Sequence, residues 1–275
     1  MPKSLTRTWY RVALDRPGRA PLLVAAAGEH LGQALQAATD HVSGAWPLAV
    51  EVATGDVVPL GDSVGKSSVV ELGEAPERPR FRWPIGVIPA LSATTAGSPG
   101  WVKHPDEHLL VIEAQIDADR LIDLFLGVIE RLPAGDNLEV RVLDSFEEAA
   151  RTDVWLTSRV NAKKILRFLD DYDTEIIGNG FVELNVYVRE HKATLRLTEH
   201  KTLVWLAEGN ALEADMIRWL GELGVPRVDT LATVDHGPHF HYRAAKSRDR
   251  KKLADELYRQ RLRIVATLKR DAPSP

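Results

Sequence analysis

The sequence predicts an α+β fold with mixed or antiparallel sheets, helices packed on one face, and two modules. Three consecutive segments, 181–189, 193–198 and 202–207, alternate between polar and apolar residues and are joined by connections of hairpin length. Segments whose apolar residues are spaced by three and four, as in helices, lie between the strand-like segments. A proline-rich stretch at 73–105 separates two such groups, which places a module boundary near its end.

Residues 1–72 are expected to form a small N-terminal module. Residues 8–14 alternate like an edge strand, and 22–27 are apolar enough for a buried strand. Residues 29–42 have helical spacing, and 47–52 are again strand-like. The module is therefore expected to have the order β-β-α-β.

Residues 73–105 are expected to be an extended connector. This stretch holds six of the sixteen prolines, which exclude a long helix or a central strand. Its apolar side chains are too numerous for a solvated linker. We therefore expect extended chain that packs over a surface.

Residues 106–245 are expected to form the main α+β domain, with the three alternating segments as a meander. A strand at 108–116 precedes a helix with apolar residues at three-and-four spacing. A similar polarity pattern recurs over 203–220, which leaves ferredoxin-like βαβ units open as one arrangement. A strand over 228–235 and a short strand over 239–243 are expected to end this domain.

Composition and length exclude several classes of protein. The chain has 275 residues, 44% of them hydrophobic and 27% charged, which is an ordinary balance for a folded globular protein. It has no cysteine, so disulfides, thiolate metal sites and cysteine nucleophiles are excluded and only His, Asp and Glu remain as common metal ligands. No apolar stretch approaches the roughly 20 residues of a membrane helix, and we expect a cytoplasmic protein.

A glycine-rich segment at 61–67 resembles a phosphate-binding loop at first sight. The two glycines are one residue too close together, and Leu60 stands where the first glycine belongs. The residues that follow are β-branched rather than helical. A surface turn is the better interpretation.

A histidine-rich segment is a second candidate for chemistry. Asp235, His236, His239 and His241 lie within seven residues, and the last two would share one face of a strand. With His236 across a turn and Asp235 as an oxygen ligand, they predict a candidate site for zinc, manganese or iron that activates water. The alternative is that they are neutral histidines at a strand end, since no second ligand cluster stands out.

An acidic cluster is the candidate binding site for a partner. Asp170, Asp171, Asp173 and Glu175 are placed around the end of a helix, where the helix dipole disfavours negative charge. A basic partner or a cation would offset that cost. A solvated loop rim is the alternative interpretation.

Residues 246–275 are expected to be a basic C-terminal helix, over about 247–268, and a tail. Residues 246–270 contain ten Lys or Arg against three acids, a net charge of +7, which leaves −11 for the remainder of a chain of net charge −4. Such a helix can bind nucleic acid, but its apolar spacing favours docking on the body of the protein. Nucleic-acid binding is therefore the minority interpretation.

These observations favour a non-catalytic protein that binds another macromolecule, as bacterial toxin-neutralising immunity proteins do. No complete catalytic motif is present, and five tryptophans expected to be exposed (Trp83, Trp101, Trp155, Trp205 and Trp219) suit a protein interface. A protein partner is expected, and no cofactor unless a divalent metal. The alternatives are a metal-dependent enzyme built on the histidine-rich segment and nucleic-acid binding through the C-terminal helix.

Overall fold

The computed structural model describes residues 7–54 and 68–269, and it shows an α+β protein with antiparallel sheets. The glycine-rich segment at 61–67 lies outside these residues. Within the described ranges, no helix is long and apolar enough to cross a membrane.

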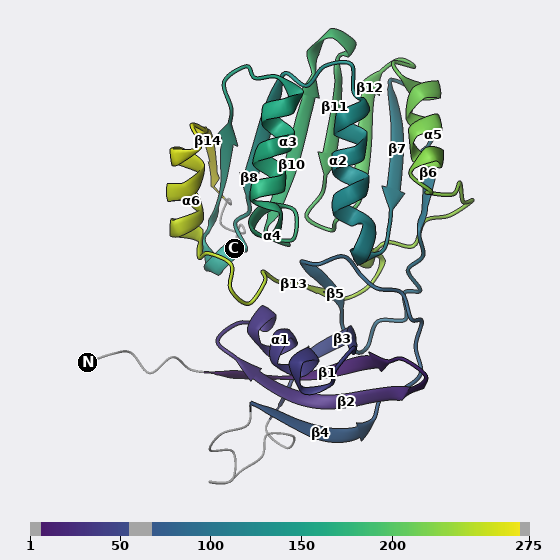
Figure 1. Ribbon diagram of the computed structural model, residues 1–275, viewed down its shortest axis with the longest axis vertical. Helices are drawn as coiled ribbons and strands as arrows, with labels where there is room; N and C mark the ends of the chain where they lie inside the picture. The colour runs from purple at the N-terminus through teal and green to yellow at the C-terminus, as the bar shows by residue number, and fades with distance from the viewer. Residues whose placement is uncertain (1–6, 55–67, 270–275) are drawn as a thin grey trace, which may run out of the picture.

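A four-stranded antiparallel sheet forms the N-terminal part of the structure. Its strand order is β3-β1-β2-β4, and α1 packs on it (Figure 1). The elements are β1 (Thr8–Arg16), β2 (Arg19–Gly28), α1 (Leu31–His41), β3 (Trp46–Val52) and β4 (Val69–Glu74). Apolar residues at alternate positions of the strands, such as Val12, Val24 and Val50, meet Leu35 of α1 in a shared core.

An eight-stranded antiparallel sheet forms the larger part. Its order is β14-β9-β8-β10-β11-β12-β7-β6, so that β10, β11 and β12 follow one another as a meander. The strands are β6 (Gly100–His104), β7 (Leu109–Gln115), β8 (Asn137–Val142), β9 (Arg151–Leu156), β10 (Val182–Val188), β11 (Ala193–Leu197), β12 (Leu203–Glu208) and β14 (Arg263–Lys269).

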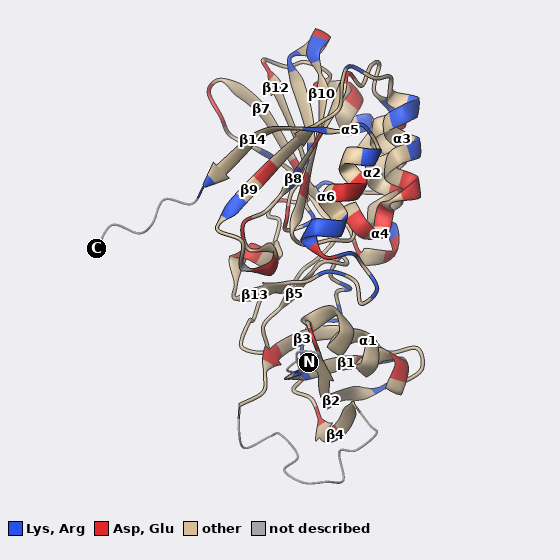
Figure 2. Ribbon diagram, turned by 90° about the vertical axis from the view of Figure 1, so that its left-hand side faces the viewer, with Lys and Arg blue, Asp and Glu red and all other residues tan. Residues whose placement is uncertain are grey.

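Helices cover one face of this sheet, as the two views together show (Figures 1 and 2). The α-helices are α2 (Leu121–Arg131), α3 (Ala162–Asp171), α4 (Asp173–Ile176), α5 (Glu213–Glu222) and α6 (Arg250–Arg259). The short 3₁₀ helices are η2 (Ala118–Arg120), η3 (Phe146–Glu148), η4 (Arg189–His191) and η5 (Val234–His236). Phe125 and Trp205 lie almost fully buried between helices and sheet. The other face carries ion pairs such as Arg196 to Glu183.

A two-stranded ribbon lies between the two sheets (Figure 1). It consists of β5 (Val87–Pro89) and β13 (His239–His241), paired antiparallel. Ile88 and Phe240 pack into the core of the four-stranded sheet. Successive side chains of β13 point to opposite faces, so its two histidines lie on the face opposite Phe240. The ribbon thus brings the histidine-rich segment to the junction of the two sheets.

The proline-rich stretch is more structured than a connector. Its extended chain includes β5, and residues 100–104 form β6 at one edge of the large sheet. Phe81 and Trp83 are buried beside Val87 and Val234. The apolar residues of this stretch therefore cover a surface, and its last residues extend the sheet.

The expected C-terminal helix over 247–268 is wrong in its second half. Helix α6 ends at Arg259, and Arg261 adopts a left-handed conformation with φ of 67°. The chain then forms β14, which pairs with β9. Ile264, Val265 and Thr267 are β-branched, which favours a strand over a helix.

The expected strand over 228–235 is also wrong. Only Arg227 forms a bridge, with Trp101, and the chain reaches η5 without further pairing. Residues 234–236 are a 3₁₀ turn instead. This difference changes where His236 points.

Candidate metal centre

Three histidines converge beside the ribbon. His239 and His241 come from β13, and His200 comes from the turn between β11 and β12. One ring nitrogen of each lies within 4.8 Å of the others. Within the described ranges, they are the one group of three or more His, Asp or Glu residues with metal-ligand spacing.

Local structure explains how each ring is placed. His239 and His241 are two residues apart on a strand, so their side chains share one face. His200 stands in a tight turn in which Lys201 adopts a left-handed conformation with φ of 64°. The fully buried Lys201 side chain anchors this turn, because its Nζ donates hydrogen bonds to the carbonyl oxygens of Asn179 and Val182.

The Nδ1 atoms of the two β13 histidines each form a hydrogen bond with a backbone carbonyl oxygen. His239 Nδ1 lies 2.8 Å from the oxygen of Gly237, and His241 Nδ1 lies 2.6 Å from the oxygen of Gly180. A carbonyl oxygen only accepts, so each Nδ1 carries the proton and donates. In the neutral ring, Nε2 then carries no proton and has an available lone pair.

Those two lone pairs face each other. The Nε2 atoms of His239 and His241 are 3.2 Å apart. Two acceptors at this distance repel each other unless a proton or a cation lies between them. Burial lowers the pKa of His241 to about 4, against the hydrogen bond to Gly180, and the neighbouring His200, His239 and Lys201 lower it further. His241 is therefore neutral at neutral pH, and a metal cation held by both Nε2 atoms would remove the repulsion.

The carboxylate of Asp235 lies near His200, on the side of its Nδ1 atom. Asp235 Oδ2 lies 3.8 Å from Nδ1 of His200. Burial opposes ionisation of Asp235, but the hydrogen bond from the Thr233 hydroxyl and the nearby His200 and His236 outweigh it, so its pKa is below the usual value. Such outer carboxylates orient histidines that ligate metals.

The donor set suits zinc. A tetrahedral zinc ion about 2.0–2.1 Å from each nitrogen places its ligand nitrogens about 3.3 Å apart. His239 and His241 are at 3.2 Å, and the three nitrogens together lie within 4.8 Å of one another. Neutral imidazole nitrogens suit zinc, whereas magnesium and calcium prefer oxygen ligands. Three protein ligands leave a fourth position for water or substrate.

The histidine cluster differs from the predicted ligand set in two residues. His239 and His241 lie in the cluster, and Asp235 lies behind it rather than among its ligands. His236 is exposed on the 3₁₀ turn and lies outside the cluster. His200 takes its place. No local spacing in the sequence indicates His200, because it is 39 residues from His239 and only the fold brings them together.

A cavity of about 510 Å³ adjoins the cluster. It lies between the two sheets, and its wall includes Tyr10, His30, Phe146, Phe181, His241 and Arg243. Arg243 stacks over the Phe146 ring at 5.7 Å and lies 3.6 Å from Glu147. Burial, with the charge of Arg243 adding to it, lowers the pKa of His30 to about 4. His241 is thus shared by the histidine cluster and the cavity.

The acidic cluster is divided in the structure. Glu175 pairs with Arg248 at 2.9 Å and also accepts from the Arg248 backbone. Asp173 accepts from the hydroxyl of Thr174, while Asp170 and Asp171 are exposed. A basic residue of the same chain therefore offsets part of this negative charge.

Comparison with known proteins finds no matching family model, no similar curated protein and no similar solved structure.

Proposed function

We propose that the protein is a metal-dependent hydrolase whose zinc ion is held by His200, His239 and His241. One observation carries this proposal. Two imidazoles face each other through their Nε2 atoms at 3.2 Å while both of their Nδ1 atoms are held by backbone carbonyls. Two neutral imidazoles in that arrangement repel each other unless they share a proton or a cation, and a cation held by both Nε2 atoms removes the repulsion.

The donor set determines the class of reaction. Three neutral imidazoles leave the full charge of a divalent ion in place, and zinc bound in this way lowers the pKa of a water molecule to about 7. Zinc has no redox chemistry, so hydrolysis is the favoured reaction. Asp235 would orient the ring of His200 and increase its basicity.

The cavity beside His241 supplies a place for the substrate. Its aromatic wall, from residues such as Phe146 and Phe181, suits an apolar or planar group. Arg243 lies at the same wall, 3.6 Å from Glu147, and its guanidinium can donate hydrogen bonds to the oxygens of a substrate. The proposal is therefore hydrolysis of an ester or phosphoester that carries an apolar group.

A panel of para-nitrophenyl esters and phosphoesters tests this function. Zinc-loaded protein is expected to hydrolyse at least one of them, and chelation followed by zinc is expected to remove and restore the activity. His239→Ala/His241→Ala should abolish it, whereas His236→Ala should retain it, because His236 lies outside the cluster. Hydrolysis of none of the panel, or hydrolysis that survives in the double variant, would contradict the proposal.

A second candidate function, binding of another protein, is favoured by β14. This edge strand pairs with β9 alone in the described part of the chain, and it exposes Ile264, Val265 and Leu268. Exposed apolar edge strands are sites where another chain adds to a sheet. Val265→Lys should then abolish capture of a partner from the native cell, and Val52→Lys, at an exposed valine of β3, should not. Equal capture by both variants would exclude β14 as the binding site.

A further inference from the structure

A second cavity lies on the large sheet, away from the metal centre. It has a volume of about 330 Å³ and lies between α3, the start of β8 and the turn from α6 to β14. None of its lining residues lines the cavity beside His241. Its volume falls in the range of small-molecule sites in proteins.

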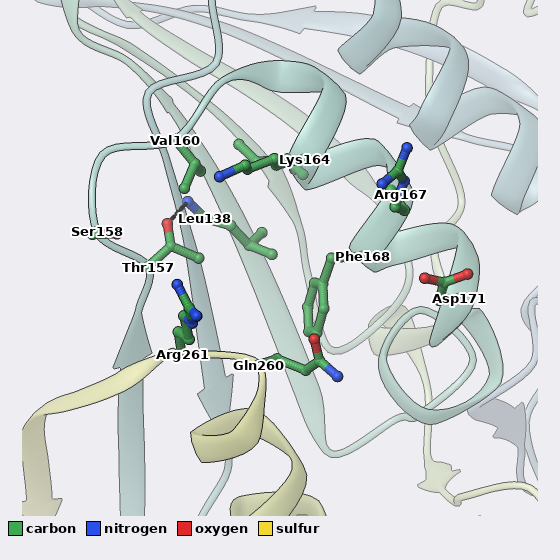
Figure 3. Close-up of a pocket in the computed structure, with 11 residues that line it drawn as sticks. Leu138, Thr157, Ser158, Val160, Lys164, Arg167, Phe168, Asp171, Gln260 and Arg261 are labelled. Atoms are coloured by element: carbon green, nitrogen blue, oxygen red, sulfur yellow. Dashed lines mark hydrogen bonds between the residues drawn. The ribbon is translucent and has the colours of Figure 1, made fainter.

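The floor of this cavity is apolar. Leu138 and Ile165 are buried, and Val160 and Phe168 are half-buried. The Phe168 ring is held against Tyr172, with ring centres 5.2 Å apart. Figure 3 shows this ring as one wall of the cavity. An apolar group of a ligand would be shielded from water here.

The charged side chains of the cavity are mostly cationic, with Lys164, Arg167 and Arg261 against one carboxylate, Asp171. Lys164 and Arg261 both point toward the region of Thr157 (Figure 3). Within the residues that the structure describes, neither side chain forms an ion pair with a carboxylate, although such pairs are frequent elsewhere on this protein. Two unpaired positive charges at one cavity favour an anion between them.

The Thr157 hydroxyl is a further polar group beside Lys164 and Arg261. Thr157 Oγ1 accepts a hydrogen bond of 2.9 Å from the Leu138 backbone, and the Thr157 carbonyl oxygen accepts one from Asn137. The side chain is therefore fixed in place. Because its oxygen already accepts, the hydroxyl proton remains to be donated to a ligand.

We propose that this cavity binds a small organic carboxylate with an aromatic or short aliphatic body. The carboxylate lies between Lys164 and Arg261 and accepts from the Thr157 hydroxyl. The apolar body packs against Phe168 and Leu138. This site is independent of the proposed hydrolase function, since it shares no residue with the histidine cluster.

Calorimetric titration with naphthoate tests the proposal. We expect saturable binding of naphthoate, and far weaker binding of two probes, naphthylmethanol, which lacks the charge, and acetate, which lacks the apolar body. Raising the salt concentration should weaken naphthoate binding because the charges are near the surface. Absence of saturable naphthoate binding, or equally tight binding of naphthylmethanol, would overturn the proposal.

Variants locate the binding. Lys164→Gln combined with Arg261→Gln should raise the dissociation constant of naphthoate about tenfold or more. Lys163→Gln is the matched control, since Lys163 is exposed on the same helix but does not line this cavity. Phe168→Ala should also weaken binding while leaving the circular dichroism spectrum unchanged. Binding that is unaffected in the double variant, or lost equally in the control, would exclude this cavity.

Discussion

His241 Nδ1 donates a hydrogen bond of 2.6 Å to the carbonyl oxygen of Gly180, which lies two residues before the start of β10. The same glycine backbone donates to the carbonyl oxygen of Tyr242 at 3.0 Å, and Tyr242 donates to that of Gly86 at 2.8 Å. The chain near β10, the ribbon strand β13 and the residue before β5 are thereby in close backbone contact. The orientation of one candidate zinc ligand depends on this contact.

Gly180→Ala should disturb the metal centre. A Cβ at this position would lie 1.9 Å from the carbonyl oxygen of Gly86, so the two backbones must separate. We expect zinc affinity to fall about tenfold or more, as for loss of an outer-shell partner, together with lower stability. Zinc competition titration and urea unfolding measure the two effects.

Gly221→Ala is the matched control for that substitution. Gly221 lies in α5, and no atom lies within 4 Å of the added Cβ. Alanine in place of glycine within a helix should stabilise the protein by about 0.5–1 kcal/mol and leave zinc affinity unchanged. Equal effects of the two substitutions would show that Gly180 has no special relation to the site.

Asp235→Asn should weaken zinc binding without removing a ligand. The carboxylate lies 3.8 Å from His200 Nδ1, close enough to act on that ring electrostatically and, when a metal is bound, to serve as its outer-shell partner. Loss of an outer-shell carboxylate typically lowers metal affinity about 10- to 100-fold. Competition with a chromogenic chelator measures the change, and Asp229→Asn, at an exposed residue, serves as control. Wild-type affinity in Asp235→Asn would mean that this carboxylate does not support the site.

His30 should make stability depend on pH below neutrality. Its pKa is about 4 in the folded protein, lowered first by burial, and about 6.5 in the unfolded chain. Between these values the unfolded chain binds a proton that the folded protein does not, so the free energy of unfolding falls as pH falls from about 6.5 to about 4. Urea unfolding at several pH values should show a shallower dependence for His30→Gln. An identical dependence would refute the assignment.

Arg250 should be the residue that holds α6 on the large sheet. Its guanidinium lies 2.8 Å from Asp153 and donates to the carbonyl oxygen of Arg151 at 2.9 Å, and both charged side chains are buried. Arg250→Ala leaves the buried Asp153 with Arg151, 3.3 Å away, as its remaining cation and should cost about 3 kcal/mol in urea unfolding. Lys252→Ala, at an exposed lysine of the same helix, should cost less than about 1 kcal/mol. Similar losses in both variants would contradict this role.

The α+β class was predictable because its signals are local. The alternation of β10, β11 and β12 and the spacing in α2 are set by which side chains face the core. The C-terminal strand was not predictable from apolar spacing alone. Leu253 and Leu257 do lie on a helix, but the pattern continues into β14, where pairing with β9 decides the structure. The division into two modules with ferredoxin-like units stays a prediction.

The candidate site was half predictable. His239 and His241 are two residues apart, and a strand places such residues on one face. His200 became visible only when the β11–β12 turn was found beside β13. His236 was predicted as a ligand because a hairpin was expected, and the 3₁₀ turn at 234–236 directs it elsewhere.

Elemental analysis of protein purified without a nickel column tests the central claim most directly. We predict one zinc ion per chain in the wild-type protein and in His236→Ala, and its loss in His200→Ala and in His239→Ala/His241→Ala. Circular dichroism of each variant would show that the fold is retained. Wild-type protein that remains metal-free after incubation with zinc, or full zinc content in the double variant, would contradict the proposed metal centre.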